Sequence, residues 1–129
     1  MTGKYPVEIR FSDVDMAGHV HNAAYFQYFE MSRIKFFYDK IAGKNWDWKK
    51  QSLVVAHNEI DYFKPIFLND RIEVEVSIAE MGTKSFKLLY QVMRGEEICA
   101  KGNTVMVCFD VEQQTSIAIP KEWLEKITV

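Results

Sequence analysis

The sequence predicts an α+β domain in which one long central helix packs on an antiparallel sheet of five to six strands. Three observations predict this class: a strand-like alternation near the start, one long stretch of helical periodicity after it, and strand patterns over most of the chain from residue 53 onward. Helices and strands that follow one another in separate runs are typical of α+β domains. At 129 residues the chain has the usual size of one domain, which we expect to span residues 1–129.

We predict the first strand over residues 6–13, because Val7, Ile9 and Phe11 alternate with polar residues. The polar segment 13–22 then interrupts the alternation. A helix is predicted from about residue 23 to about residue 40, where aromatic residues recur at three- and four-residue steps. Asn22 is the predicted N-cap of this helix, and Gly43 is its predicted stop.

The later strand patterns cover residues 53–63, 72–78, 85–93, 98–111 and 114–119, and a final helical turn is predicted over residues 120–126. Gly82 and Gly95 mark the turns of two hairpins. The apolar phase of the strand over residues 98–111 shifts near Gly102 and Asn103, which predicts a bulge or bend there.

Composition and charge exclude several classes of protein. A net charge of −2 argues against a nucleic-acid-binding protein, which usually carries a basic excess. Since no apolar run reaches the length of a signal peptide or of a membrane span, we expect a cytoplasmic protein without a membrane partner. Cys99 and Cys108 form no Cys-x-x-Cys motif, and we predict two reduced thiols, on opposite faces if the strand is regular.

One helix cannot cover both faces of a five-stranded sheet. We therefore expect a homodimer or homotetramer, formed either by extending the sheet or by sandwiching the helix.

The segment 13–22 is the candidate functional region, because it places carboxylates and histidines just before a helix N-terminus. The unpaired N–H groups of a helix start favour negative charge, so such a junction can hold both a base and a developing oxyanion. Asp13, Asp15, His19 and His21 are all possible zinc ligands, but their spacing matches no compact zinc motif, and we predict neither a metal nor another cofactor. Asp15 has a second interpretation as a turn-forming residue, and we expect Asp13 to be structural.

These motifs occur in an order that resembles the hotdog-fold acyl-CoA thioesterases, and is most similar to the 4-hydroxybenzoyl-CoA thioesterase family. The motif residues are Asp13, Asp15, Gly18, His19, Val20, Asn22, Tyr25, Tyr28, Phe29 and Glu30. Further matches are residues 60–65 followed by Asn69 and Asp70, and residues 84–86. The resemblance covers about the whole chain and implies a hotdog fold.

The resemblance implies a hydrolase that cleaves an acyl-CoA thioester to a free acid and coenzyme A. It gives Asp15 the role of catalytic carboxylate, which attacks the thioester carbonyl or activates a water molecule. A backbone N–H at about Asn22 would polarise the carbonyl oxygen. His21 departs from the family pattern, in which many members have asparagine at that position.

Further side chains are candidates for substrate binding: His19, His21, Tyr25, Glu30, His57, Lys84 and Ser85. The resemblance suggests that Lys84 and Ser85 contact coenzyme A, although an exposed hairpin explains them equally well. Glu30 is a reserve catalytic carboxylate or the partner of Arg33 in an ion pair. His57 is either a pocket wall or an ordinary strand histidine.

We therefore predict a thioesterase that acts on acyl-CoA or on the thioester of an acyl-carrier protein. No Gly-x-Ser-x-Gly elbow is present, which disfavours a serine hydrolase. The alternative is a non-catalytic module that binds acyl thioesters or an acyl-carrier protein and retains Asp15 only as a loop cap.

Overall fold

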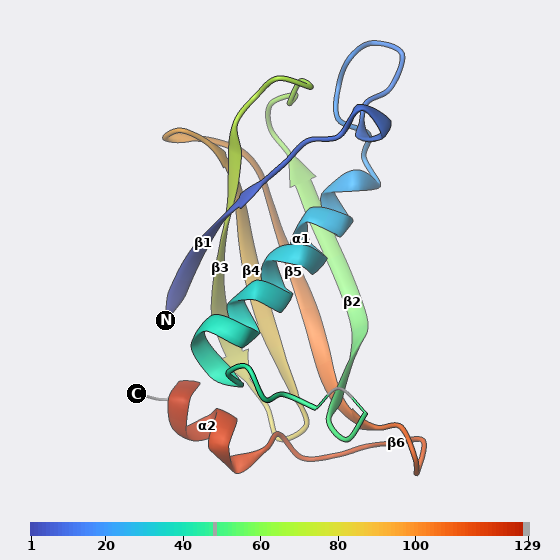
Figure 1. The fold of residues 1–129 in the computed structure, drawn as a ribbon, viewed down its shortest axis with the longest axis vertical. Helices are drawn as coiled ribbons and strands as arrows, with labels where there is room; N and C mark the ends of the chain where they lie inside the picture. Colours follow the sequence, from blue (N-terminus) through green and yellow to red (C-terminus); the bar gives the residue numbers. More distant parts are fainter. Residues whose placement is uncertain (48, 128–129) are drawn as a thin grey trace.

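A computed structural model describes residues 1–47 and 49–127. One helix lies diagonally across a single curved sheet (Figure 1), so the predicted α+β class and antiparallel sheet are confirmed. The strands are β1 (Thr2–Val7), β2 (Ser52–Tyr62), β3 (Ile72–Met81), β4 (Ser85–Arg94), β5 (Glu97–Asp110) and β6 (Thr115–Ser116). They are antiparallel in the order β1-β3-β4-β5-β2, and β6 pairs with β5.

The central helix α1 (Ala24–Phe36) continues through a π-helical turn (Phe37–Ile41) and ends before Gly43, whose φ is +70°. The predicted stop is therefore confirmed. The short helix α2 (Lys121–Ile127) closes the chain after Pro120, as predicted. No helix in the described part of the chain is long and apolar enough to cross a membrane.

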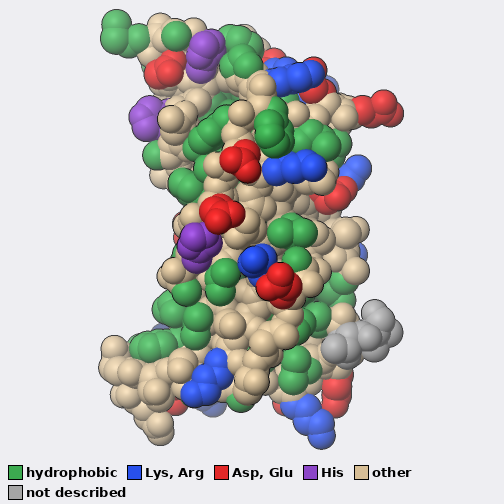
Figure 2. All heavy atoms as spheres, turned by 180° about the vertical axis from the view of Figure 1, so that it is seen from behind, with side chains coloured by type: hydrophobic (Ala, Val, Ile, Leu, Met, Phe, Trp, Pro, Cys, Tyr) green, Lys and Arg blue, Asp and Glu red, His purple; other side chains and the backbone are tan. Residues whose placement is uncertain are grey.

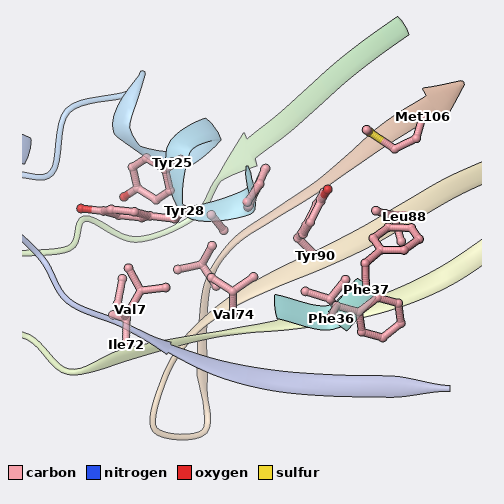
Figure 3. Packing of buried hydrophobic residues seen from close by; sticks show 14 of the residues in the cluster. Val7, Tyr25, Tyr28, Phe36, Phe37, Ile72, Val74, Leu88, Tyr90 and Met106 are labelled. Atoms are coloured by element: carbon pink, nitrogen blue, oxygen red, sulfur yellow. The ribbon is translucent and has the colours of Figure 1, made fainter. Parts of the chain in front are cut away.

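Aromatic side chains from α1 meet aliphatic side chains from the sheet in one buried layer (Figure 3). The ring of Phe29 stacks on Tyr90, with 4.1 Å between their centroids. Gly102 permits this approach, because a Cβ at that position would lie 2.5 Å from the Phe29 ring and 2.6 Å from the Glu59 carbonyl oxygen. Gly102 thus sets how closely α1 lies on β5, and with it the position of the helix start.

The bulge predicted near Gly102 is wrong, since β5 pairs regularly with β2 at Gly102 and Asn103. The apolar phase is interrupted because Gly102 fills an inward position where the Phe29 ring takes the place of a side chain. The register shift in β5 lies instead at Cys99, between the pairs with Val92 and Met93. It brings Cys99 to the buried side together with Cys108, and both are free thiols.

The first predicted strand has the wrong bounds. The pairing between β1 and β3 begins at Thr2 and ends at Val7. The chain then turns through a 3-10 helix (Phe11–Asp13), where the Asp13 carboxylate accepts a hydrogen bond from the Arg10 N–H at 3.0 Å. This turn leaves Phe11 83% exposed, although the alternation had placed it in the core.

Candidate active site

Asp15 opens a tight loop that begins and ends at the bridge between Val14 and Val20. The Asp15 N–H donates to the His19 carbonyl at 2.8 Å, and the loop turns at Gly18, whose φ is +83°. Asp15 Oδ1 accepts two backbone N–H groups, those of Ala17 at 2.9 Å and His19 at 3.1 Å. Its Oδ2 accepts no hydrogen bond from the residues that the structure describes. One oxygen is therefore fixed, and the other is available to a substrate or water molecule.

Asp13 holds the same loop in place from its buried side, and it is only 4% exposed. Its Oδ2 accepts the Tyr28 hydroxyl at 2.8 Å, its Oδ1 lies 3.3 Å from Arg10 Nη2, and its carbonyl accepts the His21 N–H at 2.7 Å. Burial raises the pKa of Asp13, but the hydrogen bonds from Arg10 and Tyr28 outweigh it, so the pKa lies below its ordinary value. Asp13 therefore has the structural role that the sequence predicts.

The N-cap of α1 is Ala23, without a hydrogen bond from its side chain, and the prediction of Asn22 as N-cap is wrong. His21 Nδ1 accepts the Ala23 N–H at 3.1 Å, and the His21 carbonyl accepts the Ala24 N–H at 2.9 Å. The Asn22 carbonyl instead accepts the Tyr62 hydroxyl at 3.1 Å. Within the described residues the Asn22 N–H has no acceptor, so it remains one of the free donors at the helix start.

The segment that follows β2 forms the wall opposite this loop. The Val20 N–H donates to the Ile66 carbonyl at 2.7 Å, and His19 bridges to Phe67. The rings of His19 and Phe67 also meet edge to face, with 5.0 Å between centroids. Loop, wall and helix start line an open cavity of about 270 Å³. Its lining residues are Asp15, His19, Val20, Asn22, Tyr25, Tyr62, Phe63, Lys64 and Pro65.

The structure thus brings Asp15, His19, Asn22 and Tyr25 together. Residues 60–65 were matched as a motif, but sequence reasoning gave Tyr62 no role in the site. The aromatic residue at the end of a strand, just before Lys64 and Pro65, was the only available signal.

Five other candidates lie outside this cavity. His21 accepts the Ala23 N–H just before α1, as described above. Glu30 is exposed on α1 at a separate cavity of about 100 Å³, which Arg33 also lines. Within the described residues no ion pair joins Glu30 to Arg33, so that alternative is not supported.

His57 lies on the face of the sheet turned away from α1, where its Nε2 is 3.2 Å from Glu59 Oε1. Hydrogen bonds from Asn103 and His57 hold the pKa of Glu59 below its ordinary value. Acidic, basic and histidine side chains are intermixed on this face (Figure 2). Lys84 and Ser85 lie at the turn between β3 and β4, at the opposite end of the sheet from the Asp15 loop (Figure 1).

The described residues contain no group of three or more His, Cys, Asp or Glu side chains placed to hold one metal ion. Asp13 is occupied by Arg10 and Tyr28, and His21 Nδ1 by the Ala23 N–H. The four candidate ligands of the segment 13–22 therefore have separate partners.

Comparison with known proteins shows which family this chain belongs to. A family model described as the thioesterase-like superfamily matches residues 9–127. The chain is 31% identical to a putative esterase of Aquifex aeolicus, over 94% of each chain. It is 28% identical to a 1,4-dihydroxy-2-naphthoyl-CoA hydrolase of Nostoc punctiforme, over 97% of this chain and 88% of that one.

A solved structure gives the same result. The fold matches a thioesterase of Thermus thermophilus, crystallised with coenzyme A and zinc, with a TM-score of 0.84 and 33% identity. The match covers 98% of this chain and 97% of that one.

Proposed function

The chain belongs to the thioesterase-like superfamily and is a thioester hydrolase, and we propose that it cleaves an acyl-CoA thioester to a free acid and coenzyme A. The observation that carries this proposal is the arrangement of Asp15, which shares one cavity with the start of α1. One Asp15 oxygen is held by two backbone N–H groups, and the other is open.

We assign Asp15 the role of nucleophile or general base. In either case the thioester carbonyl carbon is attacked, the carbonyl oxygen takes up negative charge, and the C–S bond then breaks to release the thiol. The free donors at the start of α1, among them the Asn22 N–H, would stabilise that oxygen, and the helix dipole favours the same charge. His19 and Tyr25 are the cavity residues that we propose to contact the substrate.

A second function is favoured by one observation. The two backbone hydrogen bonds to Asp15 Oδ1 are also those of a purely turn-forming aspartate. A non-catalytic module for acyl thioesters or for an acyl-carrier protein would bind its ligand in this cavity and release no thiol. An assay of thiol release from acyl-CoA esters separates the two functions.

Tyr62 provides a test of the proposed oxyanion site. Tyr62→Phe deletes only the hydroxyl that binds the Asn22 carbonyl, and this bond contributes about 1 kcal/mol to fixing the helix start. We expect kcat for thiol release to fall roughly three- to tenfold, since about 1.4 kcal/mol corresponds to a factor of ten. Tyr5→Phe is the matched control, because its hydroxyl binds Asp39 instead, and it should leave kcat unchanged. Equal activity of the two variants would contradict the role of Tyr62.

We propose that two copies pair through β2 to form a homodimer, the unit from which a homotetramer would be built. β2 is a long edge strand, and most of its side chains are exposed. Such an edge is a template for another strand. Antiparallel pairing sets the Ser52 end of one β2 beside the Tyr62 end of the other. The sheet end that carries Lys84 and Ser85 is thereby brought toward the other copy's Asp15 cavity, where these residues would contact substrate.

Sedimentation equilibrium tests the dimer. We expect the wild type to have twice the chain mass or a multiple of that, and Val54→Lys to sediment as a monomer, because a lysine on an edge strand opposes pairing. Val54 is 40% exposed, and Leu89, 41% exposed on the interior strand β4, gives the control Leu89→Lys. A monomeric wild type, or a Val54→Lys variant that associates as the wild type does, would contradict the proposal.

A further inference from the structure

A network of four charged side chains connects the wall of the Asp15 cavity to the turn between β4 and β5. Lys64 Nζ lies 2.7 Å from Glu97 Oε2. Glu97 Oε1 accepts hydrogen bonds from both Nε and Nη2 of Arg94, the former at 3.1 Å. Arg94 Nη1 in turn donates to Asp70 Oδ2 at 2.7 Å. Lys64 belongs to the cavity wall and Asp70 follows the wall in the sequence, so these ion pairs hold the segment at two points.

Arg94 is the centre of this network, because its guanidinium donates hydrogen bonds to three groups that lie in different directions. Besides the two carboxylates, its Nη1 donates to the Pro65 carbonyl at 3.0 Å. Arg94 and Asp70 are only 28% and 24% exposed at their side chains. The planar fork of an arginine can serve these partners together, whereas a lysine has a single ammonium group at the end of its stem.

Backbone hydrogen bonds connect the wall that Arg94 holds to the Asp15 loop. Asp70 Oδ2 also accepts the Phe67 N–H at 2.9 Å, which closes the turn after the wall. The neighbouring Ile66 carbonyl holds the Val20 N–H at 2.7 Å. His19, next to Val20, bridges to Phe67 and donates its own N–H to Asp15 Oδ1 at 3.1 Å. An unbroken path of hydrogen bonds and short backbone segments therefore runs from Arg94 to the Asp15 carboxylate.

We propose that Arg94 is a positioning residue for thioester hydrolysis, which holds the wall at residues 63–67 so that Asp15 faces the start of α1 at a fixed distance. Arg94 is not among the residues that line the cavity, so it acts through Pro65 and Asp70 and not by contact with substrate. This inference rests on the proposed function. It predicts that loss of Arg94 lowers kcat much more than it alters KM, because the geometry of the reacting groups changes more than the binding surface does.

Arg94→Ala and Arg94→Lys test the proposal, with Arg71→Ala as the matched control. Arg71 is exposed, directly follows Asp70 in the chain, and makes no hydrogen bond or ion pair with the described residues. We expect both Arg94 variants to lose about 10- to 100-fold in kcat with KM within about threefold, since misplacement by about 1 Å costs up to roughly a hundredfold. Arg71→Ala should match the wild type. Circular dichroism at the assay temperature establishes that each variant is folded.

Chemical rescue separates positioning from general weakening of the fold. Guanidinium ion at tens of millimolar should restore several-fold activity to Arg94→Ala and none to Arg71→Ala. Wild-type kcat in folded Arg94 variants, or a loss without rescue that follows the folded fraction, would overturn the proposal. If Arg94→Ala does not fold, the kcat of Arg94→Lys decides. A wild type without turnover would instead overturn the proposed function itself.

Discussion

Asp15→Asn is expected to abolish turnover and keep the fold. The asparagine Oδ1 can still accept the N–H groups of Ala17 and His19, and the volume of the side chain hardly changes. The open carboxylate oxygen is replaced by an amide group, which neither attacks a carbonyl nor takes a proton at neutral pH. We expect kcat for thiol release to fall by about 10²- to 10⁴-fold, the usual contribution of a positioned acid–base group.

The control for this variant is Glu125→Gln. Glu125 is an exposed carboxylate on α2, outside the Asp15 cavity and away from β2, and its replacement should leave kcat unchanged. Thermal unfolding of Asp15→Asn at nearly the wild-type temperature would show that the loss is chemical. Retained turnover in Asp15→Asn would remove Asp15 from the mechanism and make Glu30 the next carboxylate to replace.

Asp13 is expected to give the largest loss of stability among the residues of the loop. Asp13→Ala leaves the fully buried Tyr28 hydroxyl and the Arg10 N–H without their acceptor. An unsatisfied buried donor costs about 1–3 kcal/mol, so the free energy of unfolding should fall by roughly 2–4 kcal/mol. Urea denaturation measures this difference. Glu125→Ala on α2 is the surface control, expected to change the free energy of unfolding by less than about 0.5 kcal/mol. A similarly small change for Asp13→Ala would contradict the anchoring role.

The same residue predicts how stability depends on pH. Because the pKa of Asp13 is lower in the folded protein than in the unfolded chain, its ionised form stabilises the fold. That contribution is complete above the unfolded pKa of about 3.9 and is lost as the pH falls through the folded pKa. The difference in unfolding free energy between the wild type and Asp13→Asn should therefore be constant from about pH 5 to 7 and shrink below about pH 4. A difference that grows on acidification would contradict the assignment.

Periodicity predicted the larger elements well because each repeats one pattern over many residues. The alternation in β3 and the aromatic stripe of α1 are such cases, and their burial follows the pattern. The errors lie where one local turn or one long-range contact overrides the periodic pattern. Phe11 continues the alternation of the first strand, yet the Asp13 turn takes it out of the sheet. In the sequence, Gly102 resembles a break in the apolar pattern of β5. In the structure, the Phe29 ring lies against Gly102 and fills that inward position.

The site was predicted in part for the same reason. Asp15 and Asn22 are close in sequence, so a short motif is enough to bring them together. Tyr62 is 40 residues from Asn22, and only the sheet topology sets its hydroxyl against the helix start. His21 was expected to differ from the family pattern, but the hydrogen bond that its Nδ1 accepts from the Ala23 N–H depends on a ring orientation that no sequence pattern reveals. The position of Lys84 and Ser85 at the far end of the sheet likewise follows from the strand order.

Thiol release from a panel of aliphatic and aromatic acyl-CoA esters, with wild type and Asp15→Asn assayed side by side, decides whether the protein is a thioesterase that uses Asp15. We expect turnover of at least one ester by the wild type and a collapse of kcat in the variant, and the preferred ester would identify the acyl group. No turnover by folded wild type, together with saturable binding of an acyl-CoA, would rule out the hydrolase and favour the binding module.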